Sequence, residues 1–333
     1  MSSPQMDAVV ITFPGGPEVL EVRRVPQPCI APTDVLVRVH ASALNRADLL
    51  QRRGKYPAPP GFPPDIPGME FAGVIAEIGS AVRQWKPGQR VMGLIGGGAH
   101  AQYVSAHERT VAEIPGHLSW EEAAAIPEAF ITAHDALWLQ AALRPAERVL
   151  IHAVGSGVGL AAVQLARAMH AIAVGTSRTA DKVEQAKSYG LDSGFLISGT
   201  PGIEDGQRWA ENGSFDVVLD LAGGAYTSVS LHALAPRGRI VLIGTMAGAR
   251  AEIDLGLMLG KRLKMIGTVL RARPVEEKIS VTRSFAREVL PLFADGTLRP
   301  IIDSVFDLRD VRRAHERMES NATFGKIVLR IGG

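Results

Sequence analysis

The sequence predicts an α/β protein with two domains, one an antiparallel β domain and the other a doubly wound parallel sheet. Three observations support this fold class. The chain has 333 residues, and single hydrophobic cores seldom grow beyond about 250 to 300 residues. Its first third is rich in Gly and Pro between short alternating segments. Its middle alternates apolar strand patterns with helix patterns, which is typical of a parallel sheet covered by helices.

Residues 1–125 carry the signals of antiparallel strands. Apolar and polar residues alternate over 34–40 and 71–78, as expected where one face of a sheet is buried and the other is solvated. Towards the end of this segment, Ser119 and Glu122 have the spacing of a capping box, which predicts the start of a helix. A second predicted helix, through Thr132 and Trp138, leads into the middle of the chain.

Residues 126–270 alternate between strands and helices. An apolar strand over 149–154 runs into the turn Gly155-Ser156-Gly157-Val158-Gly159, followed by a helix over 160–168 and a strand over 171–175. The alternation then continues, which predicts a doubly wound parallel sheet. The later elements are a helix over 181–189, a strand over 216–220, a helix over 227–235 and a strand over 239–243.

The closing segment is expected to return to the first domain. It contains a predicted helix over 281–293 and a terminal strand over 324–329. The predicted domains are therefore 1–125 together with 271–333, and 126–270.

The glycine-rich turn is a candidate dinucleotide site. Glycines let the backbone approach a phosphate closely, and the free amides at the start of the following helix would face a pyrophosphate. The strict G-x-G-x-x-G frame fails, because Val154 and Ser156 stand where its first two glycines belong. A tight turn without a ligand is the alternative interpretation.

The residues after the second strand indicate which cofactor is preferred. An NAD site usually carries Asp or Glu about 20 residues past the turn, whereas this chain has Thr176-Ser177-Arg178, with Lys182 one helical turn beyond. Hydroxyls and cations accept a 2′-phosphate that a carboxylate would repel. The predicted cofactor is NADPH. The alternative interpretation is that Arg178 and Lys182 are ordinary solvated charges on a surface helix. The neighbouring carboxylate of Asp181 is consistent with this alternative.

Charge and cysteine content exclude several classes of protein. The formal net charge is +2 and the basic residues are scattered, so the sequence implies no nucleic-acid partner. The single cysteine, Cys29, excludes an intrachain disulfide and a multi-cysteine metal site, and it fits a cytoplasmic location.

No membrane segment or secretory signal is expected. The longest uncharged run, 149–166, contains His152, Gln164 and three glycines, which are costly in lipid. The N-terminus lacks the basic and then apolar pattern of a secretory signal.

Three motifs together reveal a family resemblance. They are the loop Asn45-Arg46-Ala47-Asp48, the segment 67–73 followed by 86–91, and the glycine turn. The chain resembles the medium-chain dehydrogenase/reductase superfamily, and within it the zinc-independent quinone oxidoreductases similar to zeta-crystallin. The resemblance implies a GroES-like catalytic domain built from both chain ends around an inserted Rossmann domain, with the active site in the cleft between them.

The chain departs from the alcohol dehydrogenase branch at the positions that hold zinc there. Asn45 replaces a cysteine, Met69 replaces a histidine, and no four-cysteine lobe follows Val91. Glu70 remains, and one carboxylate cannot make a tetrahedral zinc site. No metal is therefore expected.

The resemblance also implies the roles of individual residues. Asn45 and Tyr56 are expected at the substrate end, where an amide and a phenol can orient a carbonyl oxygen. A loop aromatic that only covers the cleft is the alternative interpretation of Tyr56. Asp48 is expected to fix its loop. By resemblance, the residues expected to bind the cofactor are Thr132 near the nicotinamide, the turn Gly155, Ser156, Gly157 and Val158, Lys182 at the 2′-phosphate, Gly244, Thr245, Thr268, Val269, Leu270 and Lys326. Ser177 and Arg178 are expected at the 2′-phosphate from the hydroxyl and charge pattern of this sequence.

Without a Lewis acid, reduction of an already electrophilic acceptor is the feasible chemistry. The leading prediction is an NADPH:quinone oxidoreductase that transfers hydride to a quinone. The alternatives are an NADPH-dependent enal or enone reductase and a low-activity NADPH-binding sensor or structural protein. The apolar strand pattern over 265–270 predicts association into a homodimer.

Overall fold

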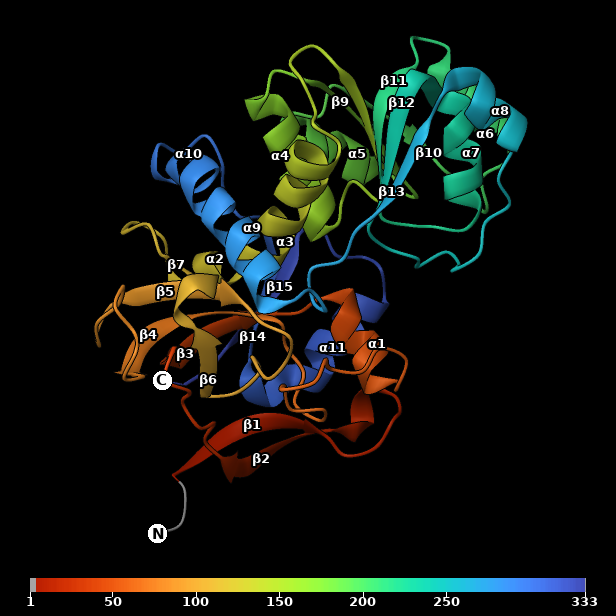
Figure 1. The fold of residues 1–333 in the computed structure, drawn as a ribbon. Helices are drawn as coiled ribbons and strands as arrows, with labels where there is room; N and C mark the ends of the chain where they lie inside the picture. The colour runs from red at the N-terminus through yellow and green to blue at the C-terminus, as the bar shows by residue number, and fades with distance from the viewer. Residues whose placement is uncertain (1–3, 333) are drawn as a thin grey trace. The chain divides into compact units, whose positions relative to one another are not determined.

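The computed structural model describes residues 4–332, and the chain folds into two compact units (Figure 1). The chain leaves unit 1 after Ile131 and re-enters it at Leu270, and unit 2 spans Thr132–Val269. Unit 2 is therefore an insertion within the sequence of unit 1.

A seven-stranded sheet forms the centre of unit 1, with strand order β14-β15-β3-β4-β5-β7 and β6 paired to β3. The pairs within the first part of the chain are antiparallel, as expected. The terminal strand β15 pairs antiparallel with β3, so the end of the chain packs onto this sheet as expected. The strands are β3 (Asp34–Ala43), β4 (Glu70–Ile78), β5 (Arg90–Leu94), β6 (Tyr103–His107), β7 (Val111–Glu113), β14 (Ile302–Asp307) and β15 (Lys326–Arg330).

A two-stranded ribbon and short helices complete unit 1. Its core contains Val37, Phe71 and Ile327, none of which is exposed to solvent. The remaining elements are β1 (Gln5–Ile11), β2 (Leu20–Pro26), α1 (Arg46–Arg52), α2 (Trp120–Ala124), α9 (Val275–Glu288), α10 (Leu290–Ala294), α11 (Val311–Glu319), and the 3₁₀ turns Pro17–Val19, Glu108–Thr110 and Leu308–Asp310. Helix α3 (Pro127–His134) contains the boundary between the units and continues as a π-helix over Asp135–Gln140.

Unit 2 is built on a six-stranded sheet with order β10-β9-β8-β11-β12-β13. Every pair in it is parallel, which confirms the predicted doubly wound sheet. The strands are β8 (Arg148–Ile151), β9 (Ile172–Ser177), β10 (Ser193–Leu196), β11 (Phe215–Asp220), β12 (Leu234–Leu242) and β13 (Lys264–Gly267).

Helices cover both faces of this sheet. Figure 1 shows α4 (Gly157–Ala168) and α5 (Ala180–Lys187) on one side, with α6 (Ile203–Ala210), α7 (Ala225–Ala233) and α8 (Leu255–Lys261) on the other. The strand order reverses between β8 and β11. Ligands of doubly wound sheets bind at the carboxyl ends of the strands that flank such a reversal, and the glycine turn follows β8 there.

Several element boundaries differ from those predicted by a few residues, most clearly at β8, α9 and α10. Strand β8 ends at Ile151 rather than at residue 154 because Ala153 adopts φ 50°, which breaks the extended backbone. Helix α9 begins at Val275, six residues before the predicted start, since Pro274 supplies its N-cap. The predicted helix over 281–293 is divided into α9 and α10 at Val289.

Within residues 4–332, none of the helices has both the length and the apolar character that crossing a bilayer requires.

Candidate functional site

The candidate site residues fall into both units, and each set is described within its own unit. Unit 1 carries Asn45, Tyr56, Leu270 and Lys326. Unit 2 carries the glycine turn and the other expected cofactor residues.

In unit 1, Asp48 fixes the loop that carries Asn45. Asn45 is the N-cap of α1, and its backbone N–H donates to Oδ2 of Asp48 at 2.7 Å. The other carboxylate oxygen accepts from the backbone N–H of Gly68 at 2.9 Å. Gly68 has φ +99°, and a Cβ there would lie 2.5 Å from the backbone nitrogen of His100, so only glycine fits. Asp48 has the loop-fixing contacts that the sequence analysis expected.

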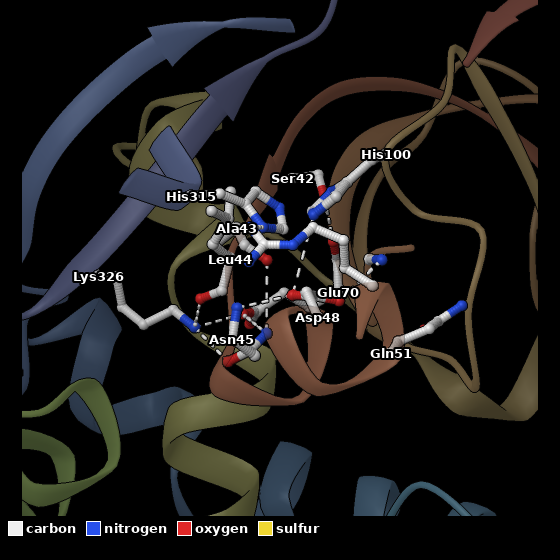
Figure 2. Close-up of polar contacts among 12 residues, drawn as sticks. Ser42, Ala43, Leu44, Asn45, Asp48, Gln51, Glu70, His100, His315 and Lys326 are labelled. Atoms are coloured by element: carbon white, nitrogen blue, oxygen red, sulfur yellow. Dashed lines mark hydrogen bonds and ion pairs between the residues drawn. The ribbon is translucent and has the colours of Figure 1, made fainter. Parts of the chain in front are cut away.

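A buried ammonium lies beside Asn45. Lys326 Nζ donates to the Leu44 carbonyl at 2.9 Å, to Asn45 Oδ1 at 2.6 Å and to Glu70 Oε1 at 2.6 Å (Figure 2). An ammonium has three hydrogens, so unit 1 itself supplies an acceptor for each of them. Lys326, expected to bind the cofactor, is therefore held as a fixed cation against Asn45 and Glu70.

The Asn45 amide is oriented at both ends. Its Oδ1 accepts from Lys326, and its Nδ2 donates to Glu70 Oε1 at 2.9 Å and, over a longer 3.4 Å, to the Ala43 carbonyl. The long contact is the one that a substrate oxygen can replace at least cost.

Glu70 accepts hydrogen bonds at both of its oxygens and is completely buried. Besides Lys326 and Asn45 at Oε1, the backbone N–H of Glu128 donates to Oε2 at 2.7 Å. Burial raises the pKa of Glu70, and the Lys326 ammonium acts in the opposite direction. Its partners are all donors, which suits the ionised carboxylate.

Glu128, which was not among the residues predicted from the sequence, lies in the first turn of α3. Burial, together with the nearby negative charge of Glu70, raises the pKa of its carboxyl to about 7. The one signal in the sequence was the Pro127-Glu128 pair at the start of a predicted helix, which is a common helix opening and points to no chemistry by itself.

Arg271, also not predicted from the sequence, holds Tyr56 in place. Its guanidinium lies 4.8 Å from the centre of the Tyr56 ring and donates to the Tyr56 carbonyl at 3.2 Å. It also donates to the Gly96 carbonyl at 2.7 Å and to Gln51 Oε1 at 2.5 Å. Burial raises the pKa of Tyr56, so its phenol remains protonated at neutral pH.

A cavity of about 700 Å³ lies in unit 1. Its lining includes the apolar side chains of Phe62, Ile66 and Ile95 together with Arg271 and Lys278. A space of this size admits a small organic molecule.

No metal-binding cluster exists among residues 4–332, since no three His, Cys, Asp or Glu side chains gather as ligands. Met69 is buried, and Asn45 and Glu70 are bonded to Lys326.

In unit 2, the glycine turn is closely packed against the start of α4. Ser156 is the N-cap of α4, and its Oγ accepts from the backbone N–H of Gly159 at 3.1 Å. A Cβ on Gly159 would lie 2.7 Å from the Ala153 carbonyl oxygen, so glycine is needed for close packing of the helix on the turn. A Cβ on Gly155 would lie 2.8 Å from Cδ of Lys182, which places the stem of this lysine beside the turn.

The end of strand β9 places the residues that were expected at a 2′-phosphate. Ser177 is buried, and its Oγ accepts from the Thr179 N–H at 3.2 Å. Arg178 is exposed and Lys182 is partly buried. Arg178 is also close enough to Tyr226 for its positive charge to act against the rise that burial causes in the tyrosine pKa.

The remaining cofactor candidates have different surroundings. The Thr132 hydroxyl is buried and has no hydrogen-bond partner within residues 4–332, so a ligand atom could supply one. Thr268 instead donates to Asp135 Oδ2 at 2.8 Å. A Cβ on Gly244 would lie 2.6 Å from the Leu221 carbonyl oxygen, and Thr245 follows directly in the same turn. Val269 is exposed and closes unit 2, while Leu270 is buried and opens the second part of unit 1.

Comparisons with known proteins agree with this architecture. Residues 31–116 match the alcohol dehydrogenase GroES-like domain, and residues 189–329 match the zinc-binding dehydrogenase family. The chain is 31% identical to the quinone oxidoreductase of Lama guanicoe, with 97% of each chain covered. It is 30% identical to the synaptic vesicle membrane protein VAT-1 homolog of Rattus norvegicus, over 98% of this chain and 84% of the relative.

A solved structure shows the same fold. The quinone oxidoreductase of Escherichia coli, crystallised in complex with NADPH, superposes with a TM-score of 0.85 at 29% identity. The match covers 98% of this chain and 99% of that one. With its GroES-like and Rossmann parts and its identity to quinone oxidoreductases over nearly the whole length, this chain belongs to the quinone oxidoreductase family of the medium-chain dehydrogenase/reductase superfamily.

Proposed function

We propose that this protein is a zinc-independent NADPH:quinone oxidoreductase. The observation that carries the proposal is the fixed ammonium of Lys326, bonded to Asn45 Oδ1 and Glu70 Oε1. A buried cation already neutralises the carboxylate of this site, and Asn45 and Met69 offer neither thiolate nor imidazole. Such a site suits an acceptor that needs no Lewis acid.

Quinones meet that requirement because their own π system delocalises the charge that arrives with a hydride. When bound, the reduced nicotinamide supplies that hydride. The protein then has to hold the two reactants together and exclude water. The Tyr56 phenol, held by Arg271, donates a hydrogen bond to the carbonyl oxygen of the acceptor, and the Asn45 amide orients it.

The cofactor proposal depends on unit 2. The amides at the start of α4 would face the pyrophosphate, apart from the Gly159 N–H, which donates to the Ser156 Oγ. The buried hydroxyl of Thr132 offers a hydrogen bond to the nicotinamide end. Ser177, Arg178 and Lys182 bind the 2′-phosphate, and this favours NADPH over NADH. The NADPH complex of the Escherichia coli quinone oxidoreductase supports a nicotinamide cofactor for this fold.

The test compares the oxidation of NADPH and NADH by the purified protein in the presence of phenanthrenequinone or a conjugated enal. We expect rapid turnover with the quinone, and a higher kcat/KM for NADPH than for NADH. A saturated carbonyl product with no quinone turnover would contradict the quinone proposal and indicate an enal reductase. Binding of NADPH without oxidation by either acceptor would indicate a sensor or structural role.

We also propose that the protein is a homodimer formed through unit 2. Strand β13 lies at the edge of its sheet, where Met265 is 38% exposed. On the neighbouring helix α8, Leu255 and Leu259 are 69% and 78% exposed. An open apolar edge of this kind favours pairing with another chain. Light scattering that shows a monomer at micromolar concentration would contradict the dimer.

A further inference from the structure

The proposed reduction consumes a proton as well as a hydride, and unit 1 contains one carboxyl suited to deliver it. We propose that Glu128 donates this proton to the acceptor, an inference that rests on the proposed function. The acceptor gains two electrons and one hydrogen as hydride, and a second hydrogen as the proton. The O–H bond of the Glu128 carboxyl breaks while an O–H bond forms on the acceptor, and solvent water then returns a proton to the carboxylate.

The geometry distinguishes Glu128 from the other two carboxylates of this cluster. Both oxygens of Asp48 accept backbone N–H groups, at 2.7 and 2.9 Å. Both oxygens of Glu70 accept hydrogen bonds, including the one from the backbone N–H of Glu128. Each oxygen of both carboxylates is therefore already a hydrogen-bond acceptor, which leaves none free to carry a proton to the substrate.

Glu128 has a different arrangement. Its backbone is tied to Glu70, while its carboxyl makes no hydrogen bond to any of residues 4–332. The residue is only partly buried, whereas Asp48 and Glu70 are completely buried. A carboxyl anchored through its own backbone N–H can therefore meet a substrate without breaking an existing contact.

Charged groups on four segments of unit 1 act on Glu128. Glu70 of β4 and Asp48 of α1 raise its pKa, in addition to burial, whereas Lys326 of β15 and Arg271 lower it. Tyr56, in the loop after α1, is in turn influenced by the charge of Glu128. The balance leaves the pKa of Glu128 at about 7, where an acid is both protonated in a large fraction of molecules and able to release its proton.

Tyr56 is a poorer proton source than Glu128. Burial raises its pKa above the ordinary value near 10, so at neutral pH its phenol donates a hydrogen bond more readily than it gives up the proton. The two side chains therefore have different roles. Tyr56 orients the acceptor oxygen and Glu128 protonates it.

The first test is kinetic and uses Glu128→Gln, Glu128→Asp and the matched control Glu113→Gln, whose exposed carboxylate lies on β7. In the wild type, kcat for quinone reduction should fall as pH rises through about 7. Glu128→Gln should lower kcat about 100-fold at pH 6.5 and abolish this pH dependence. Glu128→Asp should restore part of the rate and of the pH dependence, and Glu113→Gln should behave as the wild type.

The second test needs no turnover. Infrared difference spectra of the protein between pH 6 and pH 8 should show the C=O band of a protonated carboxyl, lost in Glu128→Gln and retained in Glu113→Gln. Fluorescence titration should show unchanged NADPH binding in Glu128→Gln.

The possible failures are distinguishable. If the wild type fails to oxidise NADPH with either the quinone or the enal, the proposed function is overturned, and the role of Glu128 with it. If the wild type is active and Glu128→Gln has the same rate and pH profile, only the role of Glu128 is overturned. An infrared C=O band that remains in Glu128→Gln overturns it as well.

Discussion

The Nζ atom of Lys326 lies 2.6 Å from Oε1 of Glu70, and both side chains are almost completely buried in unit 1. Removal of either partner of such a pair is strongly destabilising, because the remaining charge is then buried without a counter-ion and away from water. The pair also holds the Asn45 amide between its two charges. Its integrity therefore affects both the stability of unit 1 and the geometry of the substrate end.

Lys326→Met should lower the free energy of unfolding by about 3 to 5 kcal/mol, since Glu70 would remain buried without its counter-ion. Urea denaturation measures this change. The control is Lys187→Met, which removes the ammonium of an exposed ion pair with Glu184 and should cost less than about 1 kcal/mol. Equal losses in the two variants would contradict the importance of the buried pair.

Arg178→Ala and Lys182→Ala should each weaken NADPH binding by about 1 to 3 kcal/mol, because each removes a charge-assisted hydrogen bond to the 2′-phosphate. NADH lacks this phosphate, so its affinity should change little. Fluorescence titration with both cofactors measures the difference. Lys187→Ala, on the last turn of the same helix α5, is the control. Equal losses for NADPH and NADH would refute the phosphate role.

Gly159→Ala should destabilise unit 2 by about 1 to 3 kcal/mol, because the new Cβ would meet backbone oxygens rather than a side chain that can move. These oxygens belong to Ala153 and Val154, at 2.7 and 2.8 Å. We also expect weaker binding of both cofactors. Gly260→Ala is the control, since a Cβ there meets nothing within 4 Å, and thermal unfolding compares the two. A stable Gly159→Ala protein with normal affinity would show that the turn is not closely packed.

His152 should make the stability of unit 2 depend on pH. Its ring lies between the hydroxyls of Thr176 and Ser230, at 2.9 and 2.8 Å. Burial lowers the pKa of this imidazole to about 4. Because the unfolded chain binds the proton more readily, the free energy of unfolding is highest above pH 6.5 and falls as pH decreases towards 4, by about 3 kcal/mol.

Urea denaturation of the wild type and of His152→Asn between pH 4 and pH 7.5 measures this dependence. The variant should be less stable at neutral pH and should lose less stability on acidification. His117→Asn, which changes an exposed imidazole, should follow the wild type. Identical slopes in the wild type and His152→Asn would contradict the assignment.

The parts of this molecule that depend on local sequence could be predicted. The glycine turn and the helix after it are contiguous, so one stretch of chain specifies both, and the alternating strands and helices after it predicted the parallel sheet. The motif Asn45-Arg46-Ala47-Asp48 is also contiguous, and the resemblance that it carries assigned Asp48 to its loop, where Oδ2 accepts from the Asn45 N–H.

The parts of the molecule that depend on residues far apart in the sequence could not be predicted. Glu128 is surrounded by groups at positions 48, 56, 70, 271 and 326, and no local pattern brings these together. Thr268 stays a predicted cofactor residue, and no local pattern indicated its hydrogen bond to Asp135, 133 residues away along the chain. The expected roles of Asn45, Tyr56 and Lys326 stay predictions, and their contacts show how each is held.

The most direct test of the zinc-independent reaction is the rate of NADPH oxidation with phenanthrenequinone by protein treated with a chelator and shown by elemental analysis to contain no zinc. The account predicts full activity in this protein, with no increase when zinc is added back. Activity that disappears with the chelator and returns with zinc would contradict it.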